Sequence, residues 1–270
     1  MFPLPSDAGL TLPAAQAAGW RPGLAGAPRH SEIFAAAHEA SGAALALALA
    51  GDALEEGGSE EADQRPWLWV QDAAALRLSG RPYRPGLPPP LRHRLIHVAA
   101  KKPEDALFAL EEGLRCRDLA FVIGEIAGNP KALSFTASRR LSLAAERHGV
   151  PLWLVRLDAA RDLSSARLRW QAEAAPSPPP RWNSQAPGTP AWRAQLFRAR
   201  AHPPGEWLMG LRAPLPGRGE GTQAWQLVCL AGVGEGFATM RGQGAPLQAP
   251  LTAEAASCAI LSPQGERASA

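Results

Sequence analysis

The sequence contains few cysteines. Cys116, Cys229 and Cys258 are the only three in 270 residues, and no two of them form a Cys-x-x-Cys pair. The six histidines are scattered and lack the spacing of metal ligands. These patterns exclude a disulfide framework and a structural zinc site. We therefore expect a reducing, cytoplasmic environment, with no bound metal and no cofactor.

Long hydrophobic runs are also missing. The longest apolar helix candidate, residues 43–54, has about a dozen residues, whereas a membrane span needs roughly 20. The first residues, "MFPLPSDAGLTLP", lack the basic segment of a signal peptide. With 46% hydrophobic residues, the chain has ample material for a folded core. We expect a folded protein that does not enter a membrane.

Strands and helices alternate in the middle of the chain. Continuous apolar runs at 94–100, 119–126 and 151–157 predict strands that are covered on both faces. Residues 101–115 and 136–149 have helical spacing of apolar residues. This alternation predicts an α/β fold with a mostly parallel sheet flanked by helices.

The pattern changes after residue 164. "ARLRWQAEA" and "AWRAQLFRAR" alternate arginine with apolar residues, which predicts antiparallel strands at the C-terminal side of the fold. We expect three regions: a loose arm at 1–28, a domain at 29–212 and a Gly/Pro/Ala-rich tail at 213–270. Within the tail, "AWQLVCLAGV" is a further strand candidate.

A short strand, "EIF", is followed by the small-residue segment "HEASGAALALALA". A phosphate-binding loop of the form G-x-x-x-x-G-K-[ST] belongs between such a strand and helix. Aligned on Gly42, the sequence has Ala37 for the first glycine, Ala43 for the lysine and Ala44 for the hydroxyl residue. The segment is therefore either a degenerate phosphate loop or an ordinary strand-to-helix turn, and we expect no tight nucleotide binding from it.

The strand "LAFVIGEI" is where a nucleotide hydrolase would carry the acid that binds Mg²⁺. Gly124 occupies the position expected for that acid, and Glu125 follows one residue later. Because side chains alternate between the two faces of a strand, we expect Glu125 to point away from the site. Both halves of a nucleotide site are thus predicted to be lost, so we do not expect an enzyme.

Several segments carry a resemblance to a known family: "GRPYRPGL", "LIHVAAKKPEDALFALEEGLRC", "LAFVIGEI", "ASRRLSLAAERHGVPLWLVR", "SSARLRWQAEAAPS" and "PAWRAQLFRAR". The order of elements resembles the RecA core, and these segments more closely resemble the ImuA family of RecA-like accessory proteins. The resemblance spans most of 30–212 and implies a RecA-like domain with a degenerate phosphate loop.

The resemblance also implies a role and partners. ImuA proteins act with an inactive Y-family-like polymerase, ImuB, and an error-prone DnaE-type polymerase in translesion DNA synthesis during the SOS response. A non-catalytic scaffold of this kind is our leading hypothesis. A SulA-like cell-division inhibitor and a RecA-type DNA-dependent ATPase are the alternatives.

Basic residues are unevenly distributed. Arginine supplies 25 of the 28 basic side chains, and residues 77–102 contain seven basic residues and no acid. A positive face suits phosphate groups, so we expect weak binding of single-stranded DNA or contact with a partner protein. Arg156 and Arg169 could instead form internal ion pairs. The candidate contact residues are Arg81, Tyr83, Arg84, Arg139, Arg140, Arg167, Trp192, Arg198 and Arg200.

Overall fold

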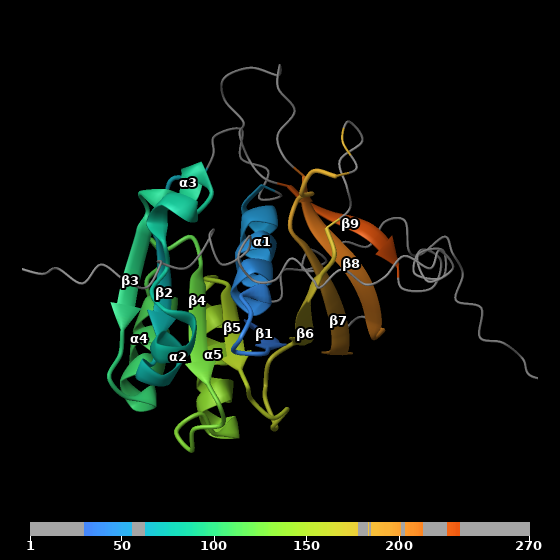
Figure 1. Ribbon diagram of the computed structural model, residues 1–270. Coiled ribbons are helices and arrows are strands. Elements are labelled where there is room, and N and C mark those ends of the chain that lie inside the picture. Colours follow the sequence, from blue (N-terminus) through green and yellow to red (C-terminus); the bar gives the residue numbers. More distant parts are fainter. Residues whose placement is uncertain are drawn as a thin grey trace, which may run out of the picture.

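The computed structural model of the protein describes residues 30–55, 63–177, 183, 185–200, 203–212 and 226–232. The expected N-terminal arm, 1–28, lies outside these ranges, as does most of the expected tail. The described strands form one sheet in the order β3-β2-β4-β5-β1-β6-β7-β8-β9 (Figure 1). Their bounds are β1 (His30–Ala35), β2 (Trp67–Gln71), β3 (Leu95–Ala99), β4 (Val122–Ala127), β5 (Leu152–Leu157), β6 (Leu168–Ala175), β7 (Ala191–Ala199), β8 (Gly205–Arg212) and β9 (Gln226–Gly232).

Neighbouring strands from β3 to β6 are all parallel, and those from β6 to β9 are antiparallel. The predicted mostly parallel α/β fold with C-terminal antiparallel strands is therefore confirmed. The strand candidate in the expected tail forms β9, which extends the sheet beyond residue 212. The helices are α1 (Ser41–Glu55), α2 (Ala73–Ser79), α3 (Pro89–Arg92), α4 (Pro103–Arg115) and α5 (Phe135–His148), with a 3₁₀ turn η2 (Arg84–Gly86).

Local sequence signals define the ends of α4 and α5. Pro103 opens α4, and Glu104 and Asp105 lie in its first turn, where carboxylates favour the positive end of the helix dipole. Ser134 caps α5 by accepting a hydrogen bond from the amide of Ala137. Gly149 ends α5 in the left-handed conformation at φ 74°, which glycine adopts without strain.

Helix α1 lies on one face of the sheet, and α4 and α5 lie on the other. Because side chains alternate along each strand, Trp69 of β2 packs on the α1 side and Val70 packs on the α4 side. Unlike a surface helix, α1 is buried almost all round: every residue from 41 to 50 is buried. It contacts β1, β5 and β6 and also β9, so the antiparallel strands curve around it. An Ala/Leu sequence without a polar face suits this position.

In the part of the chain that the structure describes, no helix is long and apolar enough to cross a membrane. The longest helix there, α1, has 15 residues.

Candidate functional site

The first candidate site is the turn between β1 and α1, residues 36–40. Gly42, which we aligned with the second glycine of a phosphate loop, lies just inside α1. A Cβ atom on Gly42 would lie 2.8 Å from the Cβ of Ala35 and 2.9 Å from the Cγ1 of Val155. Such distances do not occur between real side chains, so the fold itself requires glycine at this position. Gly42 is therefore no evidence of phosphate binding.

A carboxylate of the protein already binds the amide of Ala37 in this turn. The Oδ1 of Asp158, in the loop after β5, accepts a hydrogen bond of 2.9 Å from the amide of Ala37. The amide of Asp158 in turn donates to the carbonyl of Ala35. Asp158 has a φ of 47°, an uncommon value for a residue other than glycine. The two bonds tie the loop after β5 to the turn before α1.

A second carboxylate lies at the same helix end. Glu39 accepts a hydrogen bond of 2.9 Å from the hydroxyl of Ser41 through Oε1. Its Oε2 accepts a bond of 3.0 Å from the amide of Ala174 in β6. A phosphate group approaching the N-terminus of α1 would thus meet the charges of Asp158 and Glu39, with Ala43 where a lysine would offset its own charge.

A small cavity of about 130 Å³ lies beside this turn. Binding pockets for drug-sized ligands are larger, at about 300–1,000 Å³. The cavity lies between the turn and the residues after α2, and Trp69, Gln71 and Glu125 from the ends of β2 and β4 line it. Its other lining residues are Ala37, His38, Glu39, Ala40, Ala43, Leu78, Ser79, Gly80, Pro82 and Leu157.

The position of Glu125 corrects the sequence prediction. We expected Glu125 to point away from the site, but it lines the cavity. Gly124 faces the opposite layer: a Cβ atom there would lie 2.8 Å from Leu154 and 2.9 Å from Leu110 of α4. We had aligned Gly124 with the acid that binds Mg²⁺ in a nucleotide hydrolase. The structure shifts that alignment by one residue, because Glu125, and not residue 124, faces the α1 side. The strand-end position on that side carries a carboxyl group after all.

Hydrogen bonds fix the Glu125 carboxyl group in place. Its Oε2 accepts bonds of 2.6 Å from the side-chain amide of Gln71 and 3.3 Å from the indole N–H of Trp69. The Oε1 of Gln71 is 2.8 Å from Nε2 of His97 on β3. Glu125 is 1% exposed, and burial raises the pKa of its carboxyl group to about 7, against the lowering effect of the hydrogen bonds. At neutral pH this carboxyl group is therefore protonated in part of the molecules, whereas an ordinary glutamate is ionised.

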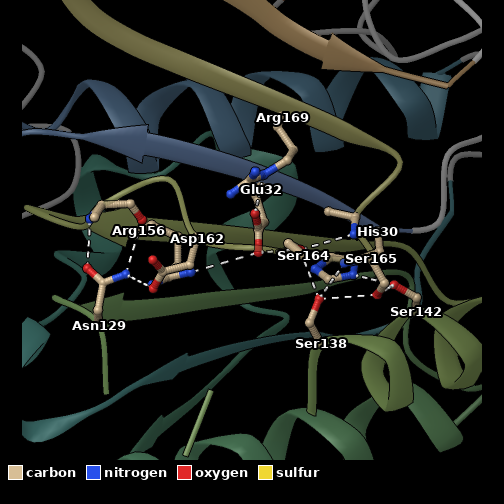
Figure 2. A network of polar contacts seen from close by, with 12 residues as sticks. His30, Glu32, Asn129, Ser138, Ser142, Arg156, Asp162, Ser164, Ser165 and Arg169 are labelled. Carbon is tan, nitrogen blue, oxygen red and sulfur yellow. Dashed lines mark hydrogen bonds and ion pairs between the residues drawn. The ribbon is translucent and has the colours of Figure 1, made fainter. Parts of the chain in front are cut away.

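A second polar cluster is buried on the opposite face of the sheet and was not predicted as a unit (Figure 2). Glu32 of β1 forms ion pairs with Arg169 of β6, at 2.7 Å, and with Arg156 of β5, at 3.8 Å. All three side chains are at most 4% exposed. Of the two alternatives for Arg156 and Arg169, internal ion pairing is the one observed. The signal in the sequence was a charged residue, Glu32, Arg156 or Arg169, next to apolar residues in each of three strands.

Serine hydroxyls connect this cluster to α5. Ser164 donates a hydrogen bond of 2.8 Å to Oε1 of Glu32, and its hydroxyl also lies 2.8 Å from that of Ser138. The hydroxyl of Ser142 lies 2.7 Å from Nδ1 of His30 (Figure 2). Burial is the main cause that lowers the pKa of His30 to about 4, so the imidazole is neutral at neutral pH. The cluster holds α5 against β1.

Asparagine and aspartate side chains join two loops at the carboxyl end of the sheet. Asn129 accepts a hydrogen bond of 2.7 Å from the amide of Ala160 and donates one of 3.1 Å to its carbonyl. Asn129 also bonds Asp162, and Arg156 donates to the carbonyl of Gly128. These bonds fix the loops after β4 and β5 to each other. In the described residues, no group of three or more His, Cys, Asp or Glu side chains could hold a metal ion.

The basic candidates do not form one surface. Arg81, Tyr83 and Arg84 lie by the edge strand β3, where Arg84 donates a hydrogen bond of 3.0 Å to the carbonyl of Leu95. Arg198 and Arg200 are exposed at the end of β7, six strand positions away in the sheet order. With neighbouring strands about 4.8 Å apart, that is about 29 Å along the sheet. A DNA strand or partner would need to span this distance to contact both groups.

Of the remaining candidates, two form ion pairs, one is exposed and one is buried. Arg140 pairs with Glu111 of α4, and Arg167 pairs with Glu146 of α5, while Arg139 is exposed. Trp192 is 2% exposed and packs in the core on the α1 side, so its prediction as a contact residue is wrong. Its strand alternates between the two faces, and Trp192 lies on the face that α1 covers.

The sheet order and the strand–turn–helix at β1 and α1 define the chain as an α/β protein with a mostly parallel sheet and antiparallel strands at its C-terminal end. Two curated proteins of Caulobacter vibrioides, from strains NA1000 / CB15N and ATCC 19089 / CIP 103742 / CB 15, are each 35% identical to it over 126 residues. Both are named Protein ImuA. The chain is therefore similar, over this stretch, to proteins of the family that the sequence resembles.

The match covers 43% of this chain, and the chain spans about half the length of the curated relatives it matches. No model of a known protein family matches the chain.

Proposed function

We propose that the protein is a non-catalytic, RecA-like accessory protein of damage-induced mutagenesis. Its similarity to proteins named Protein ImuA supports this role at the level of the family. In the finer proposal it acts as a scaffold in translesion synthesis, with an inactive Y-family-like polymerase of the ImuB type and an error-prone DnaE-type polymerase. It needs no cofactor for this role.

One observation carries the non-catalytic part: the carboxylate of Asp158 binds the amide of Ala37, in the turn where a phosphate would bind. The turn has Ala43 and Ala44 in place of lysine and a hydroxyl residue. Helix-end amides alone contribute about 0.3–1 kcal/mol to binding an anion, far below the roughly 8 kcal/mol of micromolar affinity. This favours a scaffold over the alternative of a DNA-dependent ATPase.

Calorimetry with ATP and Mg²⁺ tests this part. We expect no heat of binding at millimolar nucleotide and no release of phosphate, with or without single-stranded DNA. A variant with Asp158→Ala, Ala37→Gly, Ala43→Lys and Ala44→Thr is the comparison, because it removes the blocking carboxylate and restores the groups of a phosphate loop. Micromolar ATP binding by the unaltered chain would overturn the proposal.

The pathway is tested in the organism of origin. Deleting the gene should lower the frequency of mutations after DNA damage, and the unaltered gene should restore it. Pull-down with each of the two polymerases tests the partners. If overexpression without damage causes filamentous cells and the deletion leaves mutation frequency unchanged, the SulA-like alternative replaces this proposal.

Binding of single-stranded DNA is proposed as weak, insensitive to sequence and dependent on salt. Fluorescence anisotropy at two salt concentrations tests it. Because the two basic groups are far apart, Arg81→Ala with Arg84→Ala and Arg198→Ala with Arg200→Ala are separate variants. A loss in one pair only locates the contact, and the absence of binding at low salt removes DNA from the proposal.

A further inference from the structure

The cavity beside the turn before α1 has acidic groups in its lining and no matching base. Glu125, at the end of β4, and Glu39, in the turn, both line it. None of its lining residues is a lysine or an arginine. A buried carboxylate without a basic partner is costly, because its charge has lost the stabilisation that water gives. The cavity is therefore a place where a positive charge would be stabilised.

A buried aspartate adds negative charge next to Glu125. Asp72, which follows β2, is 1% exposed, and its amide donates a hydrogen bond of 3.2 Å to the carbonyl of Glu125. Its Oδ1 accepts a bond of 2.7 Å from the amide of Ala75 at the start of α2. Its Oδ2 is buried and has no hydrogen-bond partner among the residues that the structure describes. Two buried carboxyl groups therefore lie close together at the ends of β2 and β4.

The other buried glutamate of the sheet shows the contrast. Glu32 is likewise 1% exposed, and it pairs with Arg169 at 2.7 Å and with Arg156 at 3.8 Å. Glu125 has no such ion pair in the described residues, and burial raises the pKa of its carboxyl group to about 7. A proton thus replaces the missing counter-charge in part of the molecules. A cation that enters the cavity can displace that proton.

The size and charge of the cavity define the ligand. Its volume of about 130 Å³ suits a single head group rather than a nucleotide. Anions would meet the charges of Glu39 and Asp158 at the same turn. We propose that this cavity binds one ammonium or guanidinium group, with the carboxylate of Glu125 as its counter-ion. The proposal does not depend on the proposed function.

Gln71 holds the Glu125 carboxyl group in place for this role. The side-chain amide of Gln71 donates to Oε2 of Glu125 and, at 2.9 Å, to the carbonyl of Gly80. Burial, Arg81 and Arg84 lower the pKa of His97, so its imidazole is neutral at neutral pH. Its Nε2 then donates to Oε1 of Gln71 and fixes which end of the amide faces Glu125. The carboxyl group is therefore oriented before a cation arrives.

The cation has two possible sources with the same chemistry. It is either a free small amine or guanidine, or the side chain of a lysine or arginine from another protein. The cavity is open to both, because His38 and the half-exposed Leu78 of α2 lie in its lining at the surface.

Calorimetry of the full chain at about pH 8 tests the site with methylguanidinium and methylammonium chloride. We expect saturable binding between about 0.1 and 20 mM, a range that covers weak affinity. Potassium chloride at the same ionic strength should give none. Glu125→Gln should raise the dissociation constant roughly tenfold or more, because a charge-assisted bond is lost. Glu173→Gln, an exposed change on β6, is the control and should bind as the wild type does.

The pH dependence of binding tests the role of Glu125 as counter-ion. Because the cation competes with the proton of Glu125, affinity should fall about tenfold from pH 8 to 6. His38→Asn should keep this dependence, which separates Glu125 from the other titratable group that changes in this range at the turn. The titratable and charged groups around Glu125 are His38, Glu39, Asp72, His97, Asp158 and, beyond His97, Arg81 and Arg84.

A tethered cation tests the location. Leu78 lines the cavity and is 50% exposed, so Leu78→Lys should fold and should place an ammonium group beside Glu125. We expect this variant to bind methylguanidinium about tenfold more weakly, since its own charge occupies the site. Leu143→Lys is the matched control, because Leu143 is 53% exposed on α5, away from the cavity.

Short peptides distinguish the two sources. An acetylated and amidated peptide with one arginine or one lysine is compared with the free cations. Binding at least about tenfold tighter than that of methylguanidinium indicates a side chain of another protein, because contacts beside the cavity then add to the affinity. Equal or weaker binding indicates a free small cation. The proposal is overturned if neither free cation nor peptide binds, or if binding is unchanged in Glu125→Gln or Leu78→Lys.

Discussion

Oδ1 of Asp158 lies 2.9 Å from the amide nitrogen of Ala37, across the sheet end between the loop after β5 and the turn before α1. In a phosphate-binding loop, such amides point at the ligand. Here an aspartate of the same chain accepts the hydrogen bond. A carboxylate of the chain itself thus accepts a hydrogen bond from an amide of the turn before α1.

Replacing Asp158 should show how much its hydrogen bond with the amide of Ala37 contributes to the free energy of unfolding. Asp158→Ala should lower the free energy of unfolding by about 1 kcal/mol, because an exposed hydrogen bond to a charged group is lost. Asp158→Asn should cost less, since asparagine tolerates positive φ and its carbonyl can accept the same bond. Urea denaturation measures both. Equal losses for the two variants would mean that this bond contributes nothing.

The buried ion pairs of Glu32 predict a large effect from a small change. Glu32→Gln should lower the free energy of unfolding by about 3–5 kcal/mol, because it leaves Arg169 and Arg156 buried without a counter-charge. Glu173→Gln, an exposed change on β6, is the control and should stay within about 0.5 kcal/mol. A loss below about 1 kcal/mol for Glu32→Gln would contradict the ion pairing described here.

The raised pKa of Glu125 predicts a pH dependence. The folded protein holds this proton up to about pH 7, while the unfolded chain releases it near 4.5. The contribution of Glu125 to stability is therefore full at low pH and decreases as the pH rises from about 4.5 through 7. Glu125→Gln removes this dependence. Between about pH 5 and 8, the free energy of unfolding of the wild type should therefore fall relative to that of the variant, on the order of 2–3 kcal/mol.

Urea denaturation at several pH values between about 5 and 8 provides the comparison for Glu125. Glu173→Gln again serves as the control, since its difference from wild type should stay constant with pH. A constant difference for Glu125→Gln as well would mean that Glu125 is ionised throughout the range.

The lowered pKa of His30 predicts a pH dependence of stability that is opposite in sign to that of Glu125. Its folded pKa is about 4, against an ordinary value of 6.5, so the unfolded chain binds a proton first. The contribution of neutral His30 is present above about pH 6.5 and is lost as the pH falls through 4. Compared with His30→Asn, wild type should therefore lose stability on acidification.

The difference between wild type and His30→Asn is measured by thermal or urea unfolding at decreasing pH. His148→Asn, at the end of α5, is the control for a change of the same type. If the His30→Asn difference does not change between about pH 7 and 4, the imidazole is not held neutral by burial.

Gly124 tests the correction to the alignment. Gly124→Ala should cost about 1–3 kcal/mol, because the new methyl group meets Leu154 and Leu110. Gly124→Asp should cost more, since it adds a buried charge, and it should not create an Mg²⁺ site. Gly51→Ala is the control: its Cβ meets nothing within 4 Å, and alanine favours a helix. Full stability of Gly124→Asp would reinstate the original alignment.

Much of the fold could be predicted from the order of the residues. The apolar runs at β4 and β5 and the helical spacing of α4 and α5 are local patterns, and they required parallel strands with helical crossovers. Gly149 and Pro103 set helix ends through their own backbone geometry. The sequence alone also showed that Ala43 replaces the lysine of a phosphate loop, because that motif is defined by residue types at fixed spacing.

The tertiary structure decided which face each side chain occupies. One residue of register separates Gly124, against α4, from Glu125, in the cavity beside α1, and only the packed sheet fixes that register. Trp192 looked like a surface residue until the curved sheet placed it beneath α1. The partners of Glu32 are more than a hundred residues away in the chain, and strand order alone brings them together. Local sequence encodes secondary structure, whereas long-range contacts depend on how all the strands pack.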